Sequence, residues 1–193
     1  MFEHLLSLII LFFVVIDPFM SMGIFFAATS DFKNSKRKKS ALIAISVAIG
    51  LSLLFLFFGT GVLNVLQIKF NNFQIAGGIV LGLLGIQMSI GQVRESSQKF
   101  SHKNARAIAA VIGTPLLTGP ATITTIIVST AQYGILITGL AMLIIFALTY
   151  LLLLFSDKIT NHLGPNITQV ITTLLGIVTL SYGVTYIVAG LGL

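Results

Sequence analysis

An acidic residue and a proline stand side by side inside an apolar run near the N-terminus. Asp17 is the only charged residue between Leu5 and Ala28, and Pro18 follows it directly. Asp is a good N-cap residue and Pro is favoured at the first helical position, so the pair predicts that one helix ends here and another begins. The free N–H groups at the start of the second helix would attract an anion. The carboxylate could be compensated by a cation, an ammonium group or a bound proton.

A second interruption of the same kind is predicted about half a chain later. The stretch from Thr114 to Ile123 aligns with the stretch that starts at Asp17, so that Pro115 matches Pro18. Two simpler explanations stay open, because the prolines could merely kink their helices and Asp17 could merely cap one. If the two interruptions meet, they form a polar binding site. Its candidate residues are Asp17, Pro18, Ser21, Gly23, Thr114, Pro115, Thr118, Gly119, Pro120 and Thr122.

The composition places these residues in a membrane. Only 8% of the residues are charged, against about 25% in soluble domains, and the mean hydropathy is +1.05. The apolar runs do not alternate as β-barrel strands do, and they reach the length of about 20 residues that a membrane-spanning helix needs. The sequence therefore predicts an all-α integral membrane protein. Its six expected spans are residues 5–28, 41–66, 70–92, 107–130, 134–156 and 166–190, with a turn at 130–134.

The basic residues indicate which way the spans run. Ten of the eleven Lys and Arg residues fall in the connections on one side, and Lys69 alone falls on the other. By the positive-inside rule, both termini then face away from the cytoplasm, in the cell (inner) membrane. The Lys/Arg run at 33–39 is expected to be a solvated loop against the membrane, and nucleic acid is not expected as a partner.

Several kinds of chemistry are not expected. The chain has no cysteine, which excludes thiolate metal sites and disulfides. His4, His102 and His162 fall at span ends or in loops and are given no catalytic or metal role. No group of nucleophile, base and orienting residue appears at membrane depth, so an enzyme is not expected. No basic residue precedes the first apolar segment, which is therefore expected to be a retained span rather than a signal peptide.

The chain consists of two related halves. Gly78 to Gly85 aligns with Gly176 to Gly183, 98 residues later, close to the 97 residues that separate the two prolines. Three spans in each half reverse the chain direction, so the second half is inverted relative to the first. A single transmembrane domain, 1–193, would comprise halves at about 1–95 and 104–193, joined by a cytoplasmic loop at about 94–106. The glycines expected to bring spans 3 and 6 close together are Gly77, Gly78, Gly82, Gly85, Gly176, Gly183 and Gly190.

Four stretches resemble the MarC family of membrane proteins. They are "DPFMSMGIFF", "FQIAGG", "GTPLLTGPATITTII" and "TTLLGIVTLSYGVTYIVAGL", and the similarity runs the whole length. The resemblance implies a 3+3 layout of six spans, as in exporters similar to the lysine exporter. Some relatives, called SnatA, carry small neutral amino acids such as glycine and alanine. The family often has Asn where this chain has Asp17, and Arg where it has Gln74 and Thr173, so ion pairs at the last two positions are not expected.

These observations together predict a secondary transporter of small neutral amino acids. Asp17 would lie near the ammonium group of the zwitterion, and Thr114, Thr118, Gly119 and the free N–H groups near its carboxylate. Gly23 and Gly119 leave little room, which suits a small substrate. No cofactor is expected, while proton or sodium coupling, the direction of transport and the oligomeric state stay open. A channel and a non-transporting membrane partner or assembly protein are the alternatives.

Overall fold

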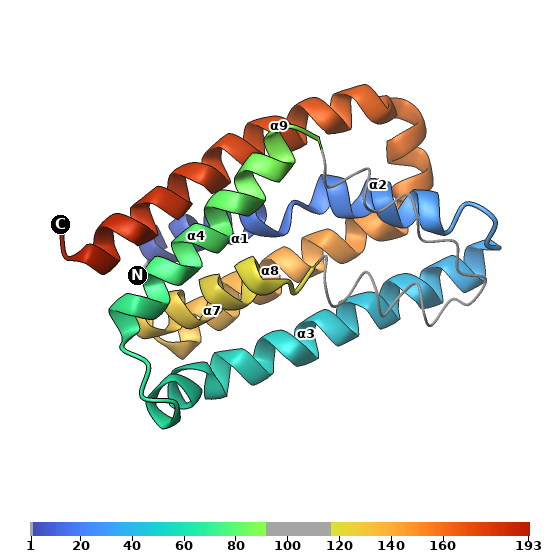
Figure 1. Ribbon diagram of the computed structural model, residues 1–193. Helices are drawn as coiled ribbons and strands as arrows, with labels where there is room; N and C mark the ends of the chain where they lie inside the picture. Colours follow the sequence, from blue (N-terminus) through green and yellow to red (C-terminus); the bar gives the residue numbers. More distant parts are fainter. Residues whose placement is uncertain (1, 92–116) are drawn as a thin grey trace.

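The structure is a computed structural model that describes residues 2–91 and 117–193 (Figure 1). Regular structure in these residues is α-helical throughout, as the apolar runs predict, and the described part of the chain contains no strand. The helices are α1 (Phe2–Ile16), α2 (Pro18–Ala28), α3 (Asn34–Val65), α4 (Phe70–Ser89), α7 (Pro120–Tyr133), α8 (Ile135–Leu154) and α9 (Ser156–Leu191).

Five segments are long and apolar enough to cross a membrane. They are Phe2–Ala28, which joins α1 and α2, then Asn34–Val65, Phe70–Ser89, Ile135–Leu154 and Asn166–Leu191. The fourth predicted span is described only in its second half. α7 has 14 residues, a length of about 21 Å, which is less than the hydrocarbon core. The first half of that span and the loop at 94–106 lie outside the described residues, so the count of six stays a prediction.

Two connections are shorter than the sequence suggested. The Lys/Arg run was expected to be a loop, but α3 begins at Asn34 and carries most of the run on its first turns. Lys and Arg are good helix formers, and nothing in this stretch breaks a helix, so the helix extends beyond the apolar segment. In the same way α9 begins at Ser156 rather than near residue 166.

Two glycines end helical segments through their backbone conformation. Gly134 has φ 83° and separates α7 from α8, so the turn expected at 130–134 contracts to one residue. Gly164 has φ 68° and interrupts α9 near its start. Residues with a side chain rarely adopt such positive φ angles. The eight residues of α9 before Gly164 therefore form a short helical arm, 156–163, at an angle to the rest of the helix (Figure 1).

α4 and α9 are the most extensively packed helix pair among the described residues. They lie side by side and run in opposite directions, as Figure 1 shows in green and red. Glycines allow backbone contact: a Cβ atom added to Gly78 would lie 2.5 Å from the Gly183 carbonyl oxygen, and one added to Gly85 would lie 2.6 Å from that of Gly176. Gly190 likewise approaches the backbone of Asn71.

Two other glycines expected to bring α4 and α9 together, Gly77 and Gly82, make different contacts. A Cβ atom added to Gly77 would collide with the Thr124 side chain of α7, so this glycine serves a different helix pair. One added to Gly82 would meet only Leu180 Cδ1, at 3.7 Å. Gly82 therefore has room for a methyl group, although its own backbone lies close to Gly183 of α9.

The other helices pack around this pair, and several of their contacts come in corresponding sets from the two halves of the chain. α2 contacts α8 and α9, and α7 contacts α3 and α4. α1 lies against α8, and α3 also lies against α8. Large apolar side chains such as Phe58, Leu136 and Leu174 are exposed on the outer surface, as expected of helices that face lipid.

Candidate functional site

The first candidate site lies where α1 ends and α2 begins. Asp17 separates the two helices with φ 41° and ψ 78°, a left-handed conformation that Asp and Asn tolerate better than other side chains. Its Oδ1 atom accepts a hydrogen bond of 3.1 Å from the Met20 N–H, so the residue is the N-cap of α2. Pro18 occupies the first position of the helix, as the sequence predicts.

The interruption frees backbone carbonyl groups at the end of α1. Because Pro18 has no N–H, the Val14 carbonyl loses its helical donor, and the Thr179 hydroxyl of α9 approaches it at 3.5 Å. The Met20 N–H that would bond to the Ile16 carbonyl is taken by Asp17, and the Ser21 hydroxyl donates to that carbonyl at 3.3 Å instead. The break therefore concentrates oxygen atoms inside the bundle.

Asp17 keeps one carboxylate oxygen without a hydrogen bond. The residue is only 4% exposed, and no donor among the described residues bonds to its Oδ2 atom. Thr172 of α9 lies beside the carboxylate, where its hydroxyl can donate to Asp17, and it is 2% exposed and bonds to no other described residue. With Thr172 as a donor, the carboxylate and the hydroxyl oxygen still have free lone pairs, so this buried pair can accept from one further polar or cationic group.

The remaining predicted residues of the first half lie along α2. Ser21 is buried and uses its hydroxyl at the break, as described above. Gly23 is half-buried, and a Cβ atom there would lie 3.9 Å from the Thr168 Cγ2 atom of α9. A methyl group would therefore fit at Gly23 in this structure.

The second half of the candidate site is described only from residue 117 onward, so Thr114 and Pro115 lie outside the described residues. Gly119 is the N-cap of α7 and Pro120 its first residue, which repeats the pattern of a cap followed by proline. Thr118 is buried and donates to the Ala48 carbonyl of α3 at 3.3 Å. Thr122 is buried one turn into α7, whereas Pro120 is exposed.

The two candidate half-sites, on α2 and at the start of α7, are not joined to each other by a hydrogen bond within the described part of the chain. Asp17 bonds within its own break and Thr118 bonds to α3. Each half nevertheless presents a buried helix N-terminus, and α1 contacts α7. Among the described residues no three His, Asp or Glu side chains gather, so no ligand set for a metal of that kind is found there.

Sequence reasoning missed a line of hydroxyl groups on α9. Thr172, Thr179 and Tyr186 are all buried, at spacings of seven residues. Thr172 lies beside Asp17, Thr179 approaches the freed Val14 carbonyl, and Tyr186 lies beside Thr125 and Ser129 of α7. The glycine stripe at 176, 183 and 190 has the same period, and the hydroxyl stripe precedes it by four residues. That repeated spacing is the signal that could have revealed it.

Comparison with known proteins extends over the whole chain. The family model described as "MarC family integral membrane protein" matches residues 2–192. A UPF0056 membrane protein of Buchnera aphidicola subsp. Baizongia pistaciae is 32% identical over 190 residues, which cover 93% of this chain and 88% of the relative. A UPF0056 membrane protein of Methanocaldococcus jannaschii is 28% identical over 187 residues, covering 93% and 91%.

The Bacillus subtilis UPF0056 membrane protein YvbG is 29% identical over 205 residues, with 99% and 95% of the two chains covered. No solved structure matches this chain. The similarity covers both candidate half-sites and the whole helix order, from α1 to α9. The chain therefore belongs to the MarC family of integral membrane proteins.

Proposed function

We propose that this protein is a secondary transporter of small neutral amino acids, such as glycine or alanine, in the cell membrane. The observation that carries the proposal is the buried pair of Asp17 Oδ2 and Thr172 Oγ1 at the break between α1 and α2, which accepts a hydrogen bond from no other described residue. A substrate ammonium group has three N–H donors and a positive charge. It would satisfy both oxygens and compensate the buried carboxylate.

The other end of the zwitterion would meet the start of α7. Helix N-termini attract carboxylates, and α7 begins at Gly119 and Pro120 with uncharged neighbours, Thr118 and Thr122. One charged and one uncharged half-site suit a substrate with one positive and one negative end. Thr114 and Pro115 belong to the same proposed half-site by the alignment of the two halves.

An inverted repeat of two three-span halves supports the transporter proposal. If a twofold axis relates the halves, α2 corresponds to α7, α3 to α8 and α4 to α9. The contact of α2 with α8 then has the contact of α7 with α3 as its counterpart, and both are present. In the same way, the contact of α2 with α9 has that of α7 with α4 as its counterpart. Reciprocal contacts of this kind are typical of a pseudo-twofold axis, and inverted repeats with broken helices are a recurrent plan of secondary transporters.

Glycine pairing supports the same symmetry. In the alignment of the halves Gly78 corresponds to Gly176 and Gly85 to Gly183. In the structure Gly78 meets Gly183 and Gly85 meets Gly176. Each residue thus contacts the counterpart of the other, as a twofold axis through the crossing of α4 and α9 requires. We further propose that both termini lie on the non-cytoplasmic side, following the distribution of basic residues.

Uptake into proteoliposomes tests the proposed function. Purified protein would be tested with labelled glycine and alanine, and with lysine and glutamate as charged comparisons, with and without proton and sodium gradients. Saturable uptake of the neutral amino acids is expected. Flux that does not saturate would favour a channel, and no flux with any amino acid would favour a non-transporting partner.

Two variants ask whether the break binds the ammonium group. Asp17→Asn and Thr172→Val should each weaken apparent affinity for every neutral amino acid, because both remove a partner of the same end of the substrate. Thr149→Val is the matched control, since Thr149 is equally buried but its hydroxyl already bonds to the Ile145 carbonyl at 2.8 Å. Unchanged affinity in both site variants would restrict Asp17 to the role of a helix cap.

A further inference from the structure

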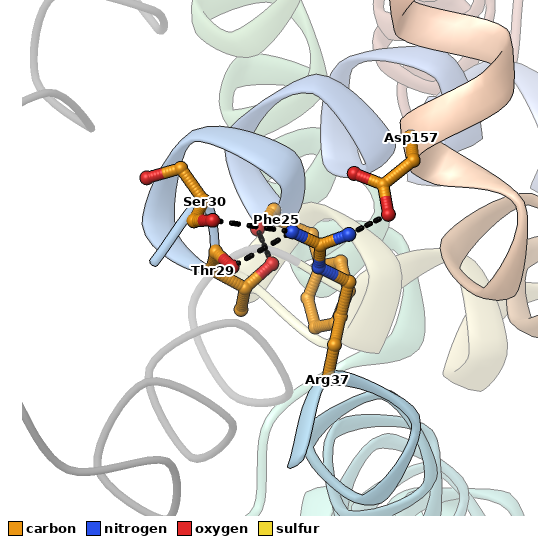
Figure 2. A network of polar contacts seen from close by, with 5 residues as sticks. All are labelled: Phe25, Thr29, Ser30, Arg37 and Asp157. Atoms are coloured by element: carbon orange, nitrogen blue, oxygen red, sulfur yellow. Dashed lines mark hydrogen bonds and ion pairs between the residues drawn. The ribbon is translucent and has the colours of Figure 1, made fainter. Parts of the chain in front are cut away.

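One basic residue of the Lys/Arg run is buried. Arg37, in the first turns of α3, is 7% exposed, whereas Lys33, Lys36, Lys38 and Lys39 are exposed. Figure 2 shows its guanidinium, which extends from α3, between the end of α2 and Asp157 of α9. One Nη atom donates to the Thr29 carbonyl at 3.0 Å, and the other forms an ion pair with Asp157. The structure thus separates Arg37 from the run that the sequence assigned as a whole to a solvated loop.

The contacts of Arg37 connect the two halves of the chain. Thr29 and Ser30, whose carbonyls lie 3.0 and 3.5 Å from an Nη atom, follow the last residue of α2. Asp157 is the second residue of α9, on the short arm before Gly164. A cation is favoured at a helix C-terminus by the helix dipole, and the planar guanidinium can bind a carbonyl and a carboxylate at once. This is the only ion pair in the part of the chain that the structure describes.

The elements joined by Arg37 each adjoin an interruption of the helical backbone. The arm at 156–163 is interrupted from the rest of α9 by Gly164, where the positive φ angle interrupts the helix. α2 is separated from α1 by the break at Asp17. Neither element is continuous with the helix that adjoins it, whereas α4 and the rest of α9 are in direct backbone contact. Asp157 is 42% exposed at its side chain, so water can replace its partner at small cost.

We propose that the Arg37–Asp157 ion pair is a latch that holds the end of α2 against the arm of α9 and closes the path to Asp17 from that end of the bundle. Opening of this end separates Arg37 from Asp157 and moves the arm about Gly164, while Arg37 stays on the carbonyls of α2. The meaning of the latch as a transport gate rests on the proposed function. The closed and open states themselves do not, because they are defined by access to α2.

Thiol labelling tests the latch without any substrate. The natural chain has no cysteine, so Ser21→Cys places a single thiol at a buried position of α2 beside the break. Its rate of reaction with a water-soluble maleimide would be measured in detergent, alone and combined with Asp157→Asn. Loss of a partly exposed ion pair should raise the labelling rate about fivefold. Asp157→Glu keeps the charge, so the labelling rate should stay close to that of Ser21→Cys alone.

Two controls make the outcome specific. Asp31→Asn removes the same charge from the α2–α3 connection, where Asp31 is exposed and forms no ion pair within the described residues, and it should leave the rate unchanged. Ser52→Cys reports global unfolding, because Ser52 is fully buried on α3, which packs on α7 and α8. An equal rise at Ser21→Cys and Ser52→Cys would overturn the proposal, since Asp157→Asn would then merely destabilise the fold. No rise at Ser21→Cys, or the same rise with Asp31→Asn, would also overturn it.

The same measurement separates the latch from the proposed function. A protein that labels faster with Asp157→Asn but takes up no amino acid has a latch without the proposed transport. A protein that transports but labels at an unchanged rate refutes the latch alone. High salt provides a further arm: it weakens partly exposed ion pairs and should raise labelling of Ser21→Cys only where Asp157 is intact.

Discussion

The packing of α4 against α9 predicts that Gly78→Ala destabilises the protein while Gly82→Ala does not. The two glycines lie one turn apart on the same helix. A Cβ atom at Gly78 would lie 2.5 Å from the Gly183 carbonyl oxygen and 2.9 Å from the Ile187 nitrogen, both backbone atoms of α9. At Gly82 the nearest atom is the end of the Leu180 side chain, at 3.7 Å.

The magnitude follows from these distances. Ordinary contact begins at 3.4 Å, so the methyl group at Gly78 is too close by 3.4 − 2.5 = 0.9 Å. Two backbones cannot yield as a flexible side chain can, so the helices must separate by most of that distance. Overpacking of this kind costs about 1–3 kcal/mol, and the better helix propensity of Ala returns up to about 1 kcal/mol. We expect a net loss of about 0.5–2 kcal/mol for Gly78→Ala and no loss for Gly82→Ala.

Unfolding of the purified variants in a mild detergent, followed by circular dichroism during heating or denaturant titration, measures the difference. Gly61→Ala on α3 is a second control, because a Cβ atom there has nothing within 4 Å. Gly183→Ala should resemble Gly78→Ala, since its Cβ atom would lie 2.7 Å from the Gly78 carbonyl oxygen. If Gly78→Ala were as stable as Gly82→Ala, the close crossing of α4 and α9 would be wrong.

Three further expectations concern backbone conformation and topology. Asp17→Asn should unfold at nearly the same temperature as the unmodified protein, because Asn can cap α2 and adopt φ 41°, whereas Asp17→Ala should lose about 1–3 kcal/mol in the same assay. Gly164→Ala should lose about 1–3 kcal/mol, because φ 68° and ψ 166° lie in a region open almost only to glycine, whereas Gly50→Ala, inside α3, should lose nothing; neither added Cβ has an atom within 4 Å. A reporter active only outside the cytoplasm should be active when fused after Leu193, and activity of a cytoplasmic reporter there would contradict the proposed orientation.

The proposed latch requires that α2 and the arm of α9 turn while the pair of α4 and the long segment of α9 stays in place. α4 and the long segment of α9 meet backbone to backbone, and a contact of this kind cannot slide or rotate without collision. α2 and the arm at 156–163 each begin or end at a residue with positive φ. The hydroxyl stripe of Thr172, Thr179 and Tyr186 lies on the long segment of α9 after Gly164, so in this proposal the first candidate half-site lies between the helix that turns and the one that stays in place.

Features that depend on neighbouring residues could be predicted from the sequence. Asp17 and Pro18 mark the end of one helix and the start of the next, because capping and the missing proline N–H act within a few residues. Long apolar runs indicate helices in a membrane, because lipid offers backbone groups no alternative partner. The glycine stripes at Gly78, Gly85, Gly176 and Gly183 could be found by their spacing, because a helix places such residues on one face.

What depends on the rotation and position of whole helices was decided by the tertiary structure alone. Spacing could not distinguish Gly82, which has room for a methyl group, from Gly78, which has none. It could not place Thr172 beside Asp17, nor bring Arg37 to Asp157, 157 − 37 = 120 residues further along the chain. Local chemistry determines where a helix begins, ends and carries small residues. Which side chains then meet is determined by how the helices cross, since a small rotation of one helix exchanges every contact along its face.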